Sequence, residues 1–432
     1  MSPARHSRKG NIRRSEHESG MRLVTEHMPG VRSVTLGVWV SVGSRDEPER
    51  IAGASHFLEH LLFKGTRKRT ARDIAEAFDA VGGDLNAYTG KEHTTFYARV
   101  LDKDLPMAVE YLCEMLQESV LRPADLDAER QVILEEINMH EDAPDELVHD
   151  VLASTLWPED PLGRAVLGTV ETISAMRRDQ VRRFWKRHYV PGNFIVAAAG
   201  NLEHEEVGGL VTSFMDTGPE VQEGRGTRVK AHAPPEAFGR VTVRNRPTEQ
   251  AHLSVGIAGL PRSDPRRYAF GVVNDALGGG MSSRLFQEIR EKRGLAYSVY
   301  SYHTMFAETG EFVIYAGTTP SKAQEVLSII DGELEEVAQK GVTDHELERA
   351  KEHLKGSTML ALEETSGRMS RLGKSELAHG EILSLDEVID RIDAVTPEDC
   401  RDIAEEVLTR PWALAVIGPF ETDAFEDWRA TA

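Results

Sequence analysis

Cysteine is scarce in this sequence, and long apolar runs are missing from it. Cys113 and Cys400 are the only cysteines among 432 residues, so neither a disulfide framework nor a cysteine-rich zinc ribbon can be built, and a reducing compartment fits. No apolar stretch approaches the roughly 20 residues that a membrane-spanning helix needs. We expect a cytoplasmic protein of the bacterial kind, with the mitochondrial matrix as the less favoured location.

The first 20 residues lack the apolar core of a secretory signal. They are basic and polar, and Glu16 and Glu18 interrupt the composition that an organelle transit peptide would have. Segments with so few apolar residues cannot bury enough surface to become ordered. We therefore expect residues 1–20 to form a disordered basic tail.

Positive charge is in deficit over the whole chain. The sequence has 51 Lys and Arg against 71 Asp and Glu, a formal net charge of −20. Such an excess repels phosphate backbones and anionic lipid, which argues against nucleic-acid and membrane partners. It would attract basic peptides, although solubility alone explains the charge equally well. The chain is long enough for two or three domains with cores of their own.

Strand-like and helix-like segments alternate in both halves, which indicates an α+β fold with an internal duplication. At an offset of 219 residues, three segments of the first half match the second half in order: Leu36-Gly37-Val38 with Val255-Gly256-Ile257, Glu129-Arg130 with Glu348-Arg349, and Asn193–Leu202 with Trp412–Phe420. We expect two homologous domains at 21–216 and 238–432, each a mostly antiparallel sheet packed with helices. A Gly- and Pro-rich linker would join them at 217–237.

The segment His56-Phe57-Leu58-Glu59-His60 carries the clearest chemical signal. Positions i, i+3 and i+4 share one face of a helix, so His56, Glu59 and His60 point the same way. Two imidazoles at this spacing can reach one zinc ion, and the glutamate between them can act as a base on water. The alternative is a pair of ordinary helix histidines beside a surface glutamate.

A catalytic zinc site needs a third protein ligand, and a later acidic helix can supply it. Glu129 and Glu136 lie two turns apart on this helix, whose apolar face would include Val132, Ile133 and Ile137. Glu136 can ligate zinc while Glu129 lies one layer out and orients the site. Without the histidine motif, the pattern would indicate only an exposed acidic face.

The second half has no such groups at the matching positions. At the 219-residue offset, the ligand candidates and Glu59 fall on residues that do not form a zinc set, namely Asp275, Gly278, Gly279 and Lys355. We therefore expect one metal site on a duplicated scaffold, with a C-terminal peptidase-like domain that lacks metal ligands.

At these residues the sequence resembles the pitrilysin/insulinase family of zinc metallopeptidases, whose inverted H-x-x-E-H motif matches residues 56–60. It is most similar to the subgroup that includes the mitochondrial processing peptidase β-subunit. Four segments carry the resemblance in order: HFLEHLLFKGT, GGDLNAYTGKEHTTFY, ERQVILEEI and RLFQEIREKRGLAYSVYS. The resemblance implies that His56, His60 and Glu136 hold one Zn²⁺ per chain. Glu59 would be the catalytic base and Glu129 an accessory catalytic carboxylate.

The resemblance also implies how a peptide substrate is held. Asn86 and Ala87 match the edge strand with which the family pairs an extended peptide through main-chain hydrogen bonds. Arg290 and Tyr297 match a pair that reaches the substrate carbonyls, and Tyr297 would donate a hydrogen bond to the oxyanion.

The function expected from this resemblance is that of a zinc-dependent endopeptidase, a hydrolase that processes extended peptides in a closed chamber. Members of the family close the chamber with four α+β units. One chain supplies two, so we expect a homodimer, with a heterodimer containing a metal-free relative left open. The alternative function is a non-catalytic scaffold or peptide-binding homologue with a vestigial metal site.

Overall fold

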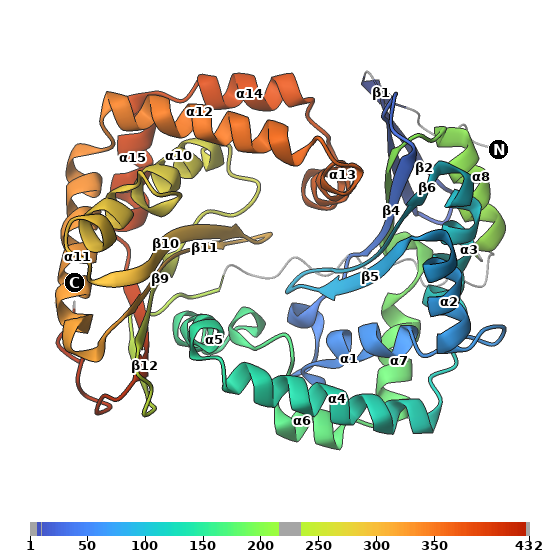
Figure 1. The fold of residues 1–432 in the computed structure, drawn as a ribbon, viewed down its shortest axis with the longest axis horizontal. Helices are drawn as coiled ribbons and strands as arrows, with labels where there is room; N and C mark the ends of the chain where they lie inside the picture. The colour runs from blue at the N-terminus through green and yellow to red at the C-terminus, as the bar shows by residue number, and fades with distance from the viewer. Residues whose placement is uncertain (1–6, 10, 216–234, 429–432) are drawn as a thin grey trace. The chain divides into compact units, whose positions relative to one another are not determined.

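A computed structural model describes residues 7–9, 11–215 and 235–428 of the chain. The chain forms two compact units, each with its own sheet (Figure 1). Unit 1 consists of Met1–Asn138, Ala165–Lys230 and Leu360–Ser384, and unit 2 of Met139–Arg164, Ala231–Met359 and Leu385–Ala432. None of the helices in the described ranges has the length and apolar character needed to cross a membrane.

The two sheets share one topology. In spatial order, the strands of unit 1 are β1 (Ser7–Lys9), β2 (Ile12–Glu16), β3 (Arg22–His27), β7 (Phe194–Gly200), β4 (Ser33–Val40), β6 (Thr94–Leu101) and β5 (Asp84–Thr89). Those of unit 2 are β8 (Val241–Asn245), β12 (Trp412–Gly418), β9 (Ala251–Ala258), β11 (Gly310–Thr318) and β10 (Ala296–Met305). The order β3-β7-β4-β6-β5 repeats as β8-β12-β9-β11-β10. In both sheets only the first of these pairs is parallel. The predicted fold class, two mostly antiparallel α+β domains, is confirmed.

The repeat has more than one offset along the sequence. Gly37 of β4 pairs with Ala197 of β7, and Gly256 of β9 pairs with Ala413 of β12. The offset is therefore 256 − 37 = 219 for the first strand of each pair but 413 − 197 = 216 for the second. Because the connecting segments differ in length, the single offset of 219 is wrong beyond β4 and β9. The projection of the metal motif onto the second half stays a prediction.

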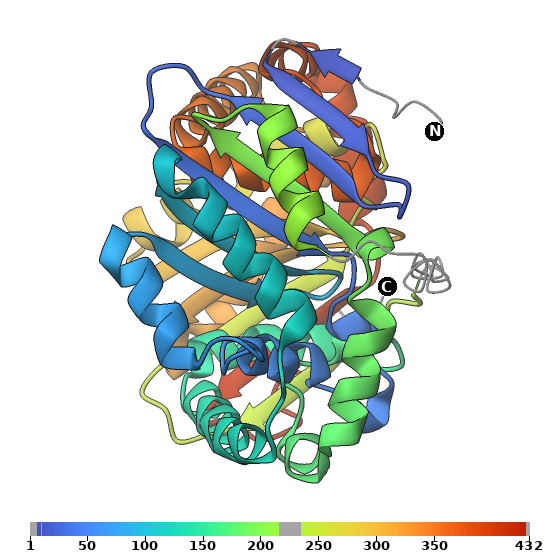
Figure 2. The ribbon, with the colours of Figure 1, turned by 90° about the vertical axis from the view of Figure 1, so that its right-hand side faces the viewer.

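Helices cover both faces of each sheet. Unit 1 contains α1 (Ala54–Leu62), α2 (Ala71–Val81), α3 (Leu105–Glu118), most of α4 (Pro123–Glu141), α6 (Val170–Ala175), α7 (Arg178–His188), α8 (His204–Phe214) and α13 (Thr365–His379). Figure 2 shows α3 and α8 side by side over the sheet of unit 1. Unit 2 contains α5 (Pro144–Leu156), α10 (Arg267–Gly278), α11 (Ala323–Lys340), most of α12 (Asp344–Ala361), α14 (Leu385–Asp393) and α15 (Pro397–Leu408). Because both faces are covered, the central strands β4, β7, β9 and β12 are almost entirely buried.

Each half of the chain contributes one helix to the other half's sheet. Helix α5 packs on β12 and β9 of unit 2, whereas α13 packs on β7 and β4 of unit 1. Each helix lies so close to its sheet that the strand beneath it needs a glycine. A Cβ on Gly37 would lie 2.6 Å from Met369 Sδ, and a Cβ on Gly256 would lie 2.7 Å from a methyl of Leu152. The units therefore differ from the predicted halves, 21–216 and 238–432, at 139–164 and 360–384.

Part of the expected disordered tail is ordered in unit 1. Residues 12–16 form β2, which pairs with β3, so the prediction of a disordered tail over residues 1–20 is wrong for this segment. The guanidinium of Arg14 donates to both carboxylate oxygens of Glu376 on α13 at 2.9 Å, and Arg22 donates to the same carboxylate at 3.2 Å. The Glu376 side chain is 0% exposed. A basic segment with few apolar residues becomes ordered here because its charge neutralises a buried carboxylate.

The predicted linker at 217–237 falls mostly outside the described residues. Residues 235–237 are described and contain no helix or strand.

Replacing Glu376 with Gln should lower the free energy of unfolding by about 2–3 kcal/mol. Removing the carboxylate takes away the buried partner that two partly buried arginines share, a loss that exceeds that of an exposed pair. Urea titration of the full chain measures the change. The control is Glu16→Gln, because Glu16 lies 3.9 Å from Arg14 and is 51% exposed, so its removal should cost less than about 0.5 kcal/mol. Equal effects of the two substitutions would contradict this role for Glu376.

Candidate metal centre

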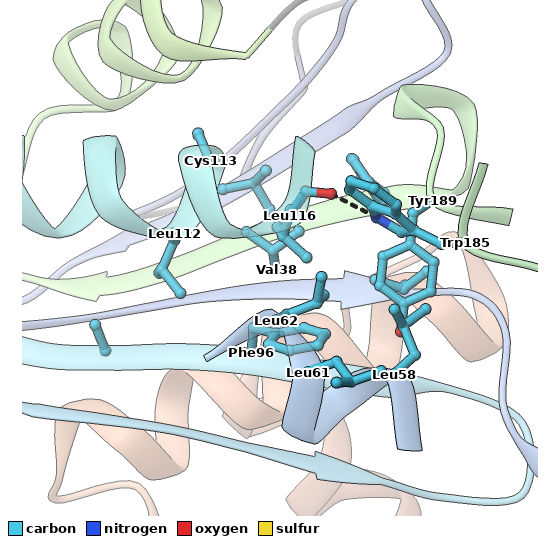
Figure 3. Close-up of a cluster of buried hydrophobic side chains, with 14 of the residues drawn as sticks. Val38, Leu58, Leu61, Leu62, Phe96, Leu112, Cys113, Leu116, Trp185 and Tyr189 are labelled. Atoms are coloured by element: carbon cyan, nitrogen blue, oxygen red, sulfur yellow. Dashed lines mark hydrogen bonds between the residues drawn. The ribbon is translucent and has the colours of Figure 1, made fainter. Parts of the chain in front are cut away.

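Helix α1 is held in place by the apolar side chains between its polar residues. Phe57, Leu58, Leu61 and Leu62 are all 0% exposed, and burial of each contributes about 1.5–3 kcal/mol. Figure 3 shows the three leucines packed in a cluster of buried side chains from the sheet, from α3 and from α7 and its C-terminal end. The other labelled hydrophobic members of this cluster include Val38, Phe96, Leu112, Leu116, Trp185 and Tyr189. The indole of Trp185 donates to the Leu116 carbonyl at 2.8 Å and links α7 to α3. This packing fixes the rotation of α1 and hence the direction of its histidines.

The N-terminus of α1 is anchored by a buried carboxylate. Glu47 is 4% exposed and accepts hydrogen bonds from the backbone N–H groups of Gly53 at 2.7 Å and Ser55 at 2.6 Å. A negative charge at this end also matches the helix dipole. Gly53 has a φ of 90°, and a Cβ there would lie 2.7 Å from the Leu167 carbonyl oxygen. The entry into the helix therefore depends on both residues.

His56, His60 and Glu136 converge in unit 1. One ligand atom from each lies within 4.8 Å of the other two, the only such group of three metal-binding side chains among the described residues. The Nε2 atoms of His56 and His60 each lie 3.7 Å from a carboxylate oxygen of Glu136. Burial, with a smaller contribution from the charge of His60, lowers the pKa of His56 to about 4. This ring is therefore neutral at pH 7, the form that binds metal ions.

The donor set and its spacing fit zinc. A separation of 3.7 Å is too long for a hydrogen bond, whereas two ligands of one tetrahedral zinc lie about 3.4 Å apart. The buried Oε2 atom of Glu136 has no hydrogen-bond partner among the described residues. Buried polar atoms left in this state are costly, and a shared cation would satisfy this carboxylate. Two imidazoles and one carboxylate also form a known catalytic zinc set.

Glu59 lies beside this group, where its carboxylate is held by a neighbouring strand. Thr89 Oγ1 of β5 donates to Glu59 Oε2 at 2.5 Å. Burial raises the pKa of the Glu59 carboxyl, the charge of Glu136 adds to that rise, and the hydrogen bond from Thr89 opposes it. A carboxylate with a raised pKa is a stronger base than one in water.

Glu129 lies on α4 and contacts His60, one of the candidate ligands on α1. Its Oε2 atom lies 3.1 Å from His60 Nδ1, and its Oε1 atom accepts from Lys64 Nζ at 2.7 Å. A carboxylate on the second ring nitrogen fixes the tautomer in which Nε2 is free to bind a metal. Glu129 is 6% exposed. The apolar face of α4 consists of Leu126, Ile133 and Ile137, and the prediction that includes Val132 is wrong, since Val132 is 44% exposed.

Asn86 and Ala87 lie on β5, the edge strand of the sheet in unit 1. Within the described part of the chain the strand pairs only with β6, so its other edge is open there. The Ala87 N–H donates to the side-chain oxygen of Asn86 at 2.8 Å, which places this donor on the open edge. Thr89 at the end of the same strand contacts Glu59, so the edge leads directly to the metal centre.

Arg290 and Tyr297 lie in unit 2 and contact one another. Arg290 is on a π-helix, η6 (Phe286–Glu291), and donates to the Tyr297 carbonyl at 2.9 Å. Its guanidinium also lies 4.6 Å from the centre of the Tyr297 ring. The Tyr297 side chain is 78% exposed, so the phenol is available to a ligand. The action of this pair on a substrate stays a prediction.

Comparison with known proteins shows to which family the chain belongs. A family model described as "Insulinase (Peptidase family M16)" matches residues 22–170, which contain the metal ligand candidates, and one described as "Peptidase M16 inactive domain" matches residues 175–354. The chain belongs to the insulinase family. The predicted membership is thereby confirmed, and the match named for an inactive domain contains Arg290 and Tyr297 of unit 2.

Several bacterial relatives in the insulinase family are named uncharacterized zinc proteases. One from Streptomyces coelicolor is 52% identical and covers 95% of this chain and 90% of its own length. One from Bacillus subtilis is 42% identical, and the match covers 94% of this chain and 98% of that protein. Among solved structures, a protease from Helicobacter pylori has a TM-score of 0.86 at 21% identity over 96% of this chain and all of that one. A peptidase M16 inactive domain from Pseudomonas fluorescens has the same TM-score at 22% identity, over 95% and 98%. At these identities the structures share the fold alone.

Three residues of the site were missed by the sequence analysis. Lys64 lies two residues beyond the end of α1, and its contact with Glu129 depends on how the chain turns there. Thr89 lies on the predicted edge strand, but its contact with Glu59 depends on how the strand passes the helix. No sequence pattern marks Glu47 as part of the site, because a loop brings it back onto the N-terminus of α1.

Replacing Glu129 with Gln should weaken zinc binding about 10- to 100-fold, because His60 loses the charge that orients its ring. Competition with a chromophoric chelator measures the affinity. Glu135→Gln, an exposed residue of the same helix, is the matched control and should bind zinc as the unaltered chain does. Unchanged affinity in the Glu129 variant would exclude an orienting role.

Proposed function

We propose that the chain is a zinc-dependent endopeptidase that hydrolyses extended peptides. The observation that supports it best is the convergence of His56, His60 and Glu136 within 4.8 Å of one another. Glu59, the one further carboxylate in the motif, lies beside them with its oxygen fixed by Thr89. Membership in the insulinase family and relatives named zinc proteases point the same way.

In the proposed reaction, the residues of this chain bind the metal and move a proton. Zinc, when bound, supplies Lewis acidity that lowers the pKa of water toward about 7. His56, His60 and Glu136 are the proposed ligands, and Glu129 holds the His60 ring. Glu59 accepts a proton from the attacking water and delivers it to the leaving amine as the peptide bond breaks.

The proposed peptide site is the open edge of β5. An extended peptide would add to this edge through main-chain hydrogen bonds, which demand little of its sequence. To use the Ala87 N–H, the peptide must displace the Asn86 side chain that now accepts from it. Asn86 would thus satisfy the donor in the free enzyme and release it to a substrate.

Arg290 and Tyr297 are proposed to act on the bound peptide. A phenol can donate a hydrogen bond to an oxyanion, and the cation of Arg290 can position a carbonyl. Because the resemblance implies four α+β units around a chamber and each chain has two, the proposed assembly is a homodimer.

Replacing Glu59 with Gln should leave zinc bound and lower kcat for a quenched peptide by about 10²–10⁴-fold. Gln keeps the size of the side chain but cannot accept the proton. Metal content is measured by atomic emission and cleavage by fluorescence, with a chelator abolishing the activity of the unaltered chain. Glu135→Gln again serves as the matched control. Full cleavage by the Glu59 variant would refute its role, and an unaltered chain that binds zinc but cleaves nothing would favour a scaffold or peptide-binding protein.

Replacing Tyr297 with Phe should lower kcat about 100-fold and change KM only a few-fold, because the lost hydrogen bond forms mainly in the transition state. Steady-state kinetics on the same peptide separate the two constants. Tyr300→Phe removes a hydroxyl three residues along the same strand and should retain activity. A Tyr297 variant in which only KM changes would assign this residue to substrate binding.

A further inference from the structure

A basic pocket lies in unit 1 among residues that take no part in the metal centre. Its volume is about 200 Å³, and its lining comes from the segment after α1, the end of α3 and the length of α7. It includes Arg67, Glu118, Leu121, Arg178, Arg182 and Lys186. Arg178, Arg182 and Lys186 recur every four residues, so they share one face of α7. Arg67 adds a fourth cation from a different segment.

The cations of the basic pocket have few counter-charges among the described residues. Among the described residues, Arg67, Arg182 and Lys186 form no ion pair, although the chain has 71 acidic residues. Glu118 is the one carboxylate in the lining and lies 3.1 Å from Lys68 Nζ, outside the lining. Burial lowers the pKa of Lys186, and the charges of Arg182 and Arg67 lower it further. The cations therefore lie close enough to repel one another. The negative end of α3 offsets only about half of one charge.

Arg178 binds backbone acceptors in the lining of the basic pocket. Arg178 donates to the carbonyl oxygens of Val120 and Leu121, two acceptors that would otherwise repel an anion. Leu121 has a φ of 45° and is the only non-glycine residue with positive φ in the described part of the chain. Such strain persists only where the surroundings enforce it, and it concentrates at functional sites. The strained turn and its arginine are therefore a fixed part of the pocket lining.

We propose that the basic pocket binds a small polyanion of the size of inorganic pyrophosphate through Arg67, Arg182 and Lys186. A ligand with two phosphate groups would relieve the repulsion among these cations and accept their hydrogen bonds. The volume suits a ligand of this size and is too small for a nucleotide to be enclosed. Because the site shares no residue with the metal centre, the proposal does not depend on the proposed peptidase activity.

Isothermal titration of the full chain with pyrophosphate at low ionic strength tests this site. Replacing Arg182 with Gln should weaken binding about 10- to 100-fold, the range for loss of one charge-assisted hydrogen bond. Arg187→Gln is the matched control, because it removes one exposed cation from the same helix outside the pocket lining. It should change the affinity less than two-fold. Raising the salt concentration should weaken binding to the unaltered chain.

Pyrophosphate can also bind zinc, so His56→Ala is titrated in parallel and should bind the anion as the unaltered chain does. Thermal unfolding without ligand checks that all variants fold equally well. Loss of binding in the His56 variant but not in the Arg182 variant would place the anion at the metal centre and overturn the proposal. Equal losses in the Arg182 and Arg187 variants, or no binding at about 1 mM pyrophosphate, would also overturn it.

Discussion

The candidate site depends on the packing of one short helix against its surroundings. Phe57, Leu58, Leu61 and Leu62 are fully buried, so α1 cannot rotate without exposing at least one of them to solvent. The intervening positions carry His56, Glu59 and His60, which must then face α4 and β5. A close-packed interior leaves little free space into which α1 or its side chains could shift. The ligand spacing thus follows from the apolar residues as much as from the histidines.

The fold was largely predictable because the local signals agree with the tertiary structure. The helix predicted to carry residues 56–60 corresponds to α1, and the glycine of the repeated Leu-Gly-Val and Val-Gly-Ile segments marks where a helix crosses the sheet. The exchange of α5 and α13 was not predictable. An amphipathic helix shows that it has an apolar face, but its sequence does not say which of two similar sheets will cover that face.

Contacts between distant segments were equally unpredictable at the site and in the basic tail. The motif at residues 56–60 and the acidic helix predict which groups could meet, because helical spacing is a local property. Thr89 and Glu47 contact α1 through hydrogen bonds between distant segments, which no spacing encodes. Arg14 was assigned to a disordered tail for the same reason, since its buried partner Glu376 lies 362 residues away.

Comparison of the two units suggests what metal binding adds to stability. In unit 1, α1 meets α4 through two imidazoles and a carboxylate that lie too far apart to hydrogen bond. Helices α10 and α12 hold the same positions in the order of unit 2, and they meet through Asp275, whose Oδ1 atom lies 2.5 Å from Nδ1 of His353. A direct pair satisfies that buried carboxylate without a metal. Among the described residues, the buried Oε2 atom of Glu136 has no such partner, so a bound cation would join the two helices of unit 1 as well as serve the proposed reaction. With a cation bound in unit 1, the duplicated scaffold would satisfy the polar junction between these helices by a different means in each unit.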